Sequence, residues 1–114
     1  MSDCIFCKIL KDEIPSTRVY EDDSVIGFRD LSPMAKEHLL FIHRDHTENV
    51  NEISDSDPAQ LSDIFKAISS YTKSNDLSKK GFRVVTNLGS DGGQTVFHTH
   101  FHVLGGEKLS GFGS

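Results

Sequence analysis

Three histidines that alternate with other residues constrain the fold of this 114-residue chain more than any other feature of its sequence. They are His98, His100 and His102. Successive side chains of an extended strand point to opposite faces, so this spacing predicts a β-strand with the three imidazoles on one face. The other face would be apolar and would pack against a core, through Phe97, Phe101 and Val103.

The row of imidazoles favours a phosphate ligand over a single metal ion. A strand rises about 3.3 Å per residue, so the Cα atoms of His98 and His102 would lie roughly 13 Å apart. Three imidazoles at that spacing would hardly share one zinc ion, because Zn–N bonds are about 2.0 Å long, although a neighbouring pair has the reach to chelate. Imidazole offers donors, an acceptor and a nucleophile without a permanent positive charge. We therefore expect an elongated anionic ligand.

A glycine-rich segment at positions 87–95 leads into the histidines. Gly92 and Gly93 are followed directly by the amide of Gln94 and the hydroxyl of Thr95. Glycine permits tight turns and a close approach of ligand to backbone. An ordinary hairpin loop contains the same turn residues, but the polar pair and the histidines that follow favour a phosphate-binding loop.

The composition indicates a single domain that spans residues 1–114. Apolar residues make up 36% and charged residues 25% of the chain, as in ordinary globular proteins. A net charge of −5 without a Lys/Arg cluster argues against nucleic-acid binding. The sequence has no apolar run long enough to cross a membrane and no signal peptide, so we expect a cytoplasmic protein. A domain of this size would gain stability from oligomerisation.

Apolar periodicity predicts an α+β fold. Short strands are predicted at positions 18–21, 24–29, 39–42 and 82–87, with the histidine strand as the fifth. A helix is predicted to begin at Pro58 and to end before Asn75, because apolar residues recur at helical spacing from Leu61 to Tyr71. Together these elements predict a five-stranded antiparallel meander sheet with one main helix packed on it.

Cys4 and Cys7 form a Cys-x-x-Cys motif and are the only cysteines in the sequence. In a cytosolic chain this spacing indicates a redox dithiol, a metal site or coincidence. The redox role is the weaker interpretation, because the βαβ context that usually accompanies it is missing. A structural zinc ion needs about two more ligands, which His46 and His98 could provide.

The motifs together resemble the histidine triad (HIT) family, and in particular its Hint-like branch of nucleotide-binding phosphoramidases. The signature of that family is His-x-His-x-His followed by two apolar residues, here positions 98–104. Similar segments at positions 5–9, 13–15, 20–23 and 28–33, and His38 before an apolar strand, extend the resemblance over nearly the whole chain. The resemblance implies a HIT-like sheet with a short N-terminal helix. It also implies a homodimer in which two sheets join.

The resemblance implies a catalytic group built around His100. This histidine would attack phosphorus and form a covalent nucleotidyl-histidine intermediate, with its ring oriented by the backbone carbonyl of His98. His38 would buttress the region, and His102 with Thr95 would contact the phosphate and the leaving group. Thr95 stands where serine is more common in this branch, and it retains the hydroxyl. No cofactor is implied for catalysis.

The resemblance also implies a purine nucleotide site. Asp30 would accept both ribose hydroxyls, because an ionised carboxylate has several acceptor positions. Phosphate contacts are implied at Asn87, Gly93, Gln94, Thr95, His100 and His102. The base pocket is implied at Ile5, Phe6, Ile9, Phe28 and Leu31, for which core packing is the alternative role.

Some bacterial members of the family bind structural zinc, and the matching positions here are Cys4, Cys7, His46 and His98. Such a site would tie the N-terminal segment to the sheet. His43 and Lys36 stand where relatives commonly have proline. We expect both to lie on the solvated surface.

Three functions remain open on the sequence. The first is hydrolysis of the P–N bond of purine nucleoside 5′-phosphoramidates, such as AMP linked to an amine or to lysine. The second is hydrolysis of diadenosine polyphosphates, as in the related Fhit-like branch. The third is a zinc-stabilised nucleotide-binding or interaction module with little turnover. The glycine pairs on both sides of the histidines favour the first.

Overall fold

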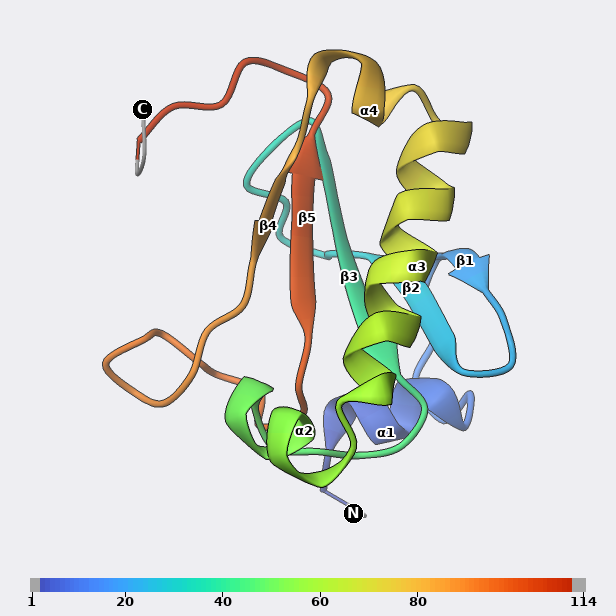
Figure 1. Ribbon diagram of the computed structural model, residues 1–114, viewed down its shortest axis with the longest axis vertical. Helices are drawn as coiled ribbons and strands as arrows, with labels where there is room; N and C mark the ends of the chain where they lie inside the picture. Colours follow the sequence, from blue (N-terminus) through green and yellow to red (C-terminus); the bar gives the residue numbers. More distant parts are fainter. Residues whose placement is uncertain (1–2, 112–114) are drawn as a thin grey trace.

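The computed structural model describes residues 3–111, which form a five-stranded antiparallel sheet with helices on both faces (Figure 1). The helices are α1 (Ile5–Leu10), α2 (Val50–Ser56), α3 (Ala59–Ser74) and α4 (Leu77–Lys80). The strands are β1 (Arg18–Glu21), β2 (Val25–Arg29), β3 (Glu37–His43), β4 (Arg83–Val85) and β5 (Phe101–Gly105). The predicted α+β fold and the short N-terminal helix are therefore confirmed.

The strand order differs from a simple meander. The order across the sheet is β1-β2-β3-β5-β4, so only the first three strands follow the chain. β5 lies between β3 and β4 and pairs with both (Figure 1). Burial explains this order, because β5 carries the fully or nearly fully buried Phe101 and Val103, whereas all residues of β4 are half-buried. The more apolar strand takes the inner position, and the less apolar strand forms the edge.

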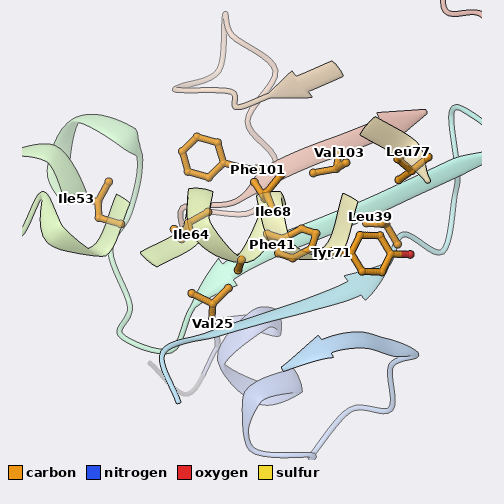
Figure 2. Close-up of a cluster of buried hydrophobic side chains, with 11 residues drawn as sticks. Val25, Leu39, Phe41, Ile53, Ile64, Ile68, Tyr71, Leu77, Phe101 and Val103 are labelled. Carbon is orange, nitrogen blue, oxygen red and sulfur yellow. The ribbon is translucent and has the colours of Figure 1, made fainter. Parts of the chain in front are cut away.

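The main helix packs on one face of the sheet as its periodicity predicts. α3 begins directly after Pro58 and ends at Ser74, and its buried face includes Ile64, Ile68 and Tyr71. These side chains meet Phe41 of β3 in the cluster drawn in Figure 2. The core of this face is therefore built by apolar side chains of the helix and of the inner strands.

β3 is buried on both faces of the sheet. Leu39 and Phe41 point into the cluster under α3, whereas Leu40 and Ile42 belong to a second cluster with Phe6 of α1. Both clusters exclude water. Because successive side chains of a strand point to opposite faces, β3 contributes residues to both clusters. The second cluster forms the floor on which the candidate site is built.

Two short helices lack a clear sequence signal. α2 buries only Ile53, so it shows no apolar periodicity, and its N-terminus is capped by the side chain of Asn49. α4 has four residues and buries Leu77. Among the described helices, none is both long enough and apolar enough to cross a membrane.

The histidine strand begins later than predicted. β5 starts at Phe101, so His98 and His100 precede the strand and the three imidazoles do not share one strand face. The preceding segment pairs with a loop instead, because the Thr99 amide donates to the Thr47 carbonyl at 2.8 Å. Phe97 is 51% exposed, so its predicted place in the core is wrong.

Candidate functional site

A cavity of about 240 Å³ lies on the α1 face of the sheet, beside the histidines. Its walls contain nine of the predicted nucleotide-site residues: Ile5, Phe6, Ile9, Phe28, Asp30, Leu31, Thr95, His100 and His102. The lining also includes six residues that were not predicted to belong to the site: Ile14, Pro15, Ser16, Arg29, Leu40 and Val96. A larger cavity, of about 510 Å³, lies beside α4 and has no histidine in its lining, so size alone does not identify the site.

Aromatic and aliphatic side chains form the apolar half of the cavity. The rings of Phe6 and Phe28 meet edge to face with centroids 5.5 Å apart. Leu31, at 94% exposure, is available to cover a ligand. Asp30 lines the same cavity, and its Oδ1 accepts a hydrogen bond from the Ser32 amide at 2.8 Å. The aromatic rings and the Asp30 carboxylate suit a ligand that has a flat apolar group next to a diol.

The ring of His100 is held in one orientation. Its Nδ1 lies 2.7 Å from the backbone oxygen of His98, and a nitrogen facing a carbonyl must carry the proton and donate. Nε2 is then the unprotonated nitrogen, and within residues 3–111 it has no hydrogen-bond partner. Burial lowers the pKa of His100, and Phe6 contacts its ring with centroids 5.0 Å apart. A neutral imidazole with an available lone pair therefore borders the cavity.

A second chain of hydrogen bonds sets the tautomer of His102. The Met34 amide donates to Nδ1 of His38 at 3.0 Å, so the proton of a neutral His38 ring lies on Nε2. That nitrogen lies 2.9 Å from Nδ1 of His102, which accepts and leaves the His102 proton on Nε2. Burial, with His100 and His38 nearby, lowers the pKa of His102 to about 4. His102 is therefore a neutral hydrogen-bond donor at neutral pH.

The glycine-rich loop reaches the cavity through Thr95. The buried Gln94 side chain donates to the carbonyls of Glu48 and Val96 and accepts from the Gly89 amide, so its amide group is used within the loop. Asn87 donates to the Gly92 carbonyl at 2.7 Å, and Gly93 adopts a positive φ of 84°. Asn87, Gly93 and Gln94 are outside the lining of the cavity, and their contact with phosphate stays a prediction.

The four predicted metal ligands lie close together. Cys4 Sγ is 3.4 Å and Cys7 Sγ is 3.6 Å from Nδ1 of His98, and Cys7 Sγ is 3.3 Å from Nδ1 of His46. The two Nδ1 atoms are 3.0 Å apart. All four donor atoms lie within 4.8 Å of one another. We call Cys4, Cys7, His46 and His98 the tetrad.

The tetrad fits a tetrahedral zinc ion. Zn–S bonds of about 2.3 Å and Zn–N bonds of about 2.0 Å give tetrahedral S–N edges of about 3.5 Å and N–N edges of about 3.3 Å. The separations of the donor atoms in the tetrad, 3.3–3.6 Å between sulfur and nitrogen and 3.0 Å between the two nitrogens, are close to these edges. Nε2 of His98 lies 3.3 Å from the His43 carbonyl, to which it donates, and this leaves Nδ1 free to bind metal. Burial, then His46, lowers the pKa of His98 to about 4.

A second cluster, of Asp30, His38 and His102, also has its donor atoms within 4.8 Å of one another. It fits a metal ion poorly, because Nε2 of His38 carries the proton that the Met34 amide forces onto it. That proton is shared with His102 at 2.9 Å, and Asp30 Oδ2 lies 3.5 Å away. We therefore interpret this cluster as a hydrogen-bond relay.

Comparison with known proteins identifies the family. The HIT domain family matches residues 11–109. This chain belongs to the HIT domain family. A HIT-like protein of Borreliella burgdorferi is 42% identical over 114 residues, which cover 99% of this chain and 82% of that protein. The purine nucleoside phosphoramidase of Escherichia coli K12 is 38% identical over 105 residues, which cover 92% of this chain and 88% of that protein.

Solved structures agree with this HIT membership. A histidine triad protein from Clostridium difficile superposes with a TM-score of 0.94 and 46% identity, over 98% of this chain and 97% of that one. A HIT family hydrolase from Clostridium thermocellum has a TM-score of 0.92 and 44% identity, over 97% and 96% of the two chains. The predicted family is confirmed.

Two residues of this HIT protein have partners that sequence reasoning missed. His43 is buried, accepts from the Asp45 amide at 3.2 Å and lies 3.1 Å from Asp63 of α3, so its predicted surface position is wrong. The Met34 amide sets the His38 tautomer through its backbone, and a backbone donor has no signature in residue type. Lys36 is exposed, as predicted.

Proposed function

We propose that this HIT protein is a nucleotide-binding hydrolase that cleaves the P–N bond of purine nucleoside 5′-phosphoramidates. The observation that carries the proposal is the 2.7 Å hydrogen bond from His100 Nδ1 to the His98 carbonyl, which prepares Nε2 as a nucleophile beside the cavity. The name of the Escherichia coli relative supports a phosphoramidate over a dinucleoside polyphosphate.

Binding would place the nucleoside in the apolar half of the cavity. A purine would lie among Phe6, Phe28 and Leu31, where burial of its faces supplies affinity. The ribose hydroxyls would donate to the Asp30 carboxylate, and the phosphate would then lie near His100 and His102. Holding phosphorus in line with His100 Nε2 converts the attack into an intramolecular step.

In the first step the lone pair of His100 Nε2 forms a bond to phosphorus, and the P–N bond to the amine breaks. The departing nitrogen must gain one proton to leave as a neutral amine. This proton comes from water through the Thr95 hydroxyl, while the Nε2–H of the neutral His102 donates a hydrogen bond to the phosphate; both residues line the cavity. The products of this step are the free amine and a nucleotidyl-histidine.

In the second step water attacks phosphorus, the bond to His100 breaks, and the nucleoside monophosphate leaves. The proton that the attacking water releases replaces the one taken up by the amine in the first step, and His102 keeps its Nε2–H in both steps. The relay from Met34 through His38 keeps Nδ1 of His102 as the acceptor of a hydrogen bond throughout. The net reaction consumes one water molecule.

We also propose a structural zinc ion at the tetrad. Cys4 and Cys7 belong to the N-terminal segment at α1, whereas His46 and His98 come from two distant loops. A bound ion would contribute folding free energy by joining these segments. Free thiols at this site suit a reducing compartment such as the cytoplasm.

We propose a homodimer as well. Within the described chain β4 pairs only with β5 and leaves one edge of the sheet open. A second copy that pairs at this edge would satisfy its unpaired backbone groups.

The test is release of AMP from adenosine 5′-phosphoramidate and, separately, from a diadenosine polyphosphate. Wild type and His100→Ala would be compared without added metal. We expect wild type to prefer the phosphoramidate and the variant to be inactive while it still binds AMP. Preference for the dinucleotide would contradict the substrate assignment. A folded wild-type protein that binds AMP and hydrolyses neither compound would contradict the enzyme assignment.

A further inference from the structure

His98 belongs to two sites at once. Through its side chain it is part of the tetrad, with Nδ1 within 3.6 Å of both cysteine sulfurs and 3.0 Å from His46. Through its backbone it orients the nucleophile, because its carbonyl accepts the hydrogen bond from His100 Nδ1 at 2.7 Å. The same residue therefore connects the tetrad to the reacting atom.

The His98 side chain is held tightly. It is 1% exposed, Nε2 donates to the His43 carbonyl at 3.3 Å, and the Phe6 ring lies against it with centroids 5.9 Å apart. With both ring nitrogens engaged, the imidazole has one orientation. A fixed side chain limits rotation of the peptide groups on either side of its own Cα.

The backbone at His98 is held by a pairing outside the sheet. The His98 carbonyl and the Thr99 N–H belong to one planar peptide group, and that N–H donates to the Thr47 carbonyl at 2.8 Å. This hydrogen bond fixes the direction of the His98 carbonyl. Thr47 directly follows His46, so tetrad residues adjoin both sides of the pairing, and the direction of the carbonyl depends on the tetrad that holds them.

We propose that Cys4, Cys7 and His46 are positioning residues for the nucleophile, acting through His98. Breaking the tetrad releases the His98 ring, allows its carbonyl to turn, and lets the His100 ring populate orientations in which Nε2 no longer faces phosphorus. This inference rests on the proposed role of His100. It predicts a slower chemical step with little change in nucleotide affinity, because neither His46 nor His98 lines the cavity. The tetrad acts on the site through the hydrogen bond from His100 to the His98 carbonyl.

The test breaks the tetrad from opposite sides. Cys7→Ser removes a sulfur on α1, which also carries part of the base pocket, whereas His46→Asn removes a ligand from a loop that does not line the cavity. We expect both variants to lower the single-turnover rate roughly tenfold, while the AMP dissociation constant stays within about twofold. Ile64→Val is the matched control, because Ile64 is buried under α3 on the other face of the sheet.

A second readout needs no turnover. The ring nitrogens of His100, followed by ¹⁵N NMR, report the Nδ1–H tautomer directly. We expect one tautomer in wild type and in Ile64→Val, and a mixture in Cys7→Ser and His46→Asn. If Cys7→Ser does not fold, Cys4→Ser takes its place, because serine retains the N-cap of α1.

The outcomes separate this inference from the proposed function. Unchanged turnover and an unchanged His100 tautomer in both tetrad variants would overturn it. A rate loss in Cys7→Ser alone, with weaker AMP binding, would also overturn it, since loosening of α1 would then be the cause. A wild-type protein with no activity would contradict the proposed function, and the NMR comparison would still decide the role of the tetrad.

Discussion

Single hydrogen bonds decide the protonation pattern of the candidate site. The Met34 amide places the His38 proton on Nε2, and His38 in turn places the His102 proton on Nε2. The His98 carbonyl does the opposite at His100, where it holds the proton on Nδ1. Two neighbouring histidines thus present a donor and a lone pair to the same cavity, although their side chains are chemically identical.

The relay predicts the effect of substitutions at His38. His38→Ala removes the donor to Nδ1 of His102, so the His102 proton is free to move to the wrong nitrogen, and we expect kcat to fall roughly 10- to 100-fold. His38→Gln retains an N–H at a similar reach and should recover part of that loss. Steady-state kinetics and AMP titration check both variants. Equal kcat in His38→Ala and wild type would contradict the relay.

The lowered pKa of His102 predicts a pH dependence of stability. The unfolded chain binds a proton near pH 6.5 but the folded chain only near pH 4, so the free energy of unfolding falls as the pH drops through this range. The groups facing His102 are His100, His38 and Asp30. One pKa unit corresponds to about 1.4 kcal/mol, and partial exposure of the ring reduces the effect, so we expect a loss of about 1–2 kcal/mol.

Urea unfolding of wild type and His102→Gln at pH 7 and pH 4.5, both with a chelator present, measures this effect. The variant should lose less stability between the two pH values than wild type does. The same pH dependence in both proteins would show that His102 does not titrate in this way.

At the scale of elements, close packing between β2 and β3 determines which residues fit. Gly27 lies opposite Phe41 in the strand pairing, and a Cβ at Gly27 would come within 2.7 Å of the Phe41 ring. The ring fills the space that glycine leaves and also contacts Tyr20 and Tyr71. Glycine is therefore required here for space and not for its backbone conformation.

This packing predicts that Gly27→Ala is destabilising. The Phe41 ring is fully buried and cannot move without disturbing the core, so we expect a loss of about 1–3 kcal/mol in the free energy of unfolding. Urea denaturation measures the loss. In the Phe41→Leu background the same substitution should cost less, and an equal cost in both backgrounds would contradict the steric explanation.

At the scale of the whole molecule, the tetrad joins segments that are distant in the sequence. Cys4 and His98 are separated by 94 positions, and Cys7 and His46 by 39. The tetrad exists only where folding has brought these segments together, so an ion that binds there stabilises the folded chain over the unfolded one.

Zinc should therefore raise the melting temperature of the metal-free protein. The stabilisation grows with the logarithm of the free zinc concentration and reaches about 4 kcal/mol at a thousandfold excess over the dissociation constant. Thermal unfolding with zinc or with a chelator measures it, and Cys7→Ser should remove most of the difference. An equal response of wild type and Cys7→Ser would place the metal effect elsewhere in the molecule.

The sequence by itself predicted most of the local elements and the residues of the candidate site. Helical spacing from Leu61 to Tyr71 predicted α3, alternation of apolar residues predicted the strands, and the histidine and cysteine motifs predicted residues that the fold does bring together. These features depend on neighbours in the chain, so residue order is sufficient to read them.

Tertiary structure alone decided the insertion of β5 between β3 and β4, the bend that separates His98 and His100 from the strand, and the burial of His43 beside Asp63. It also decided which ring nitrogen of His38, His100 and His102 carries the proton. Each of these depends on a backbone group or a side chain that chain folding brings close. Because residue type does not encode such contacts, local pattern could not predict them.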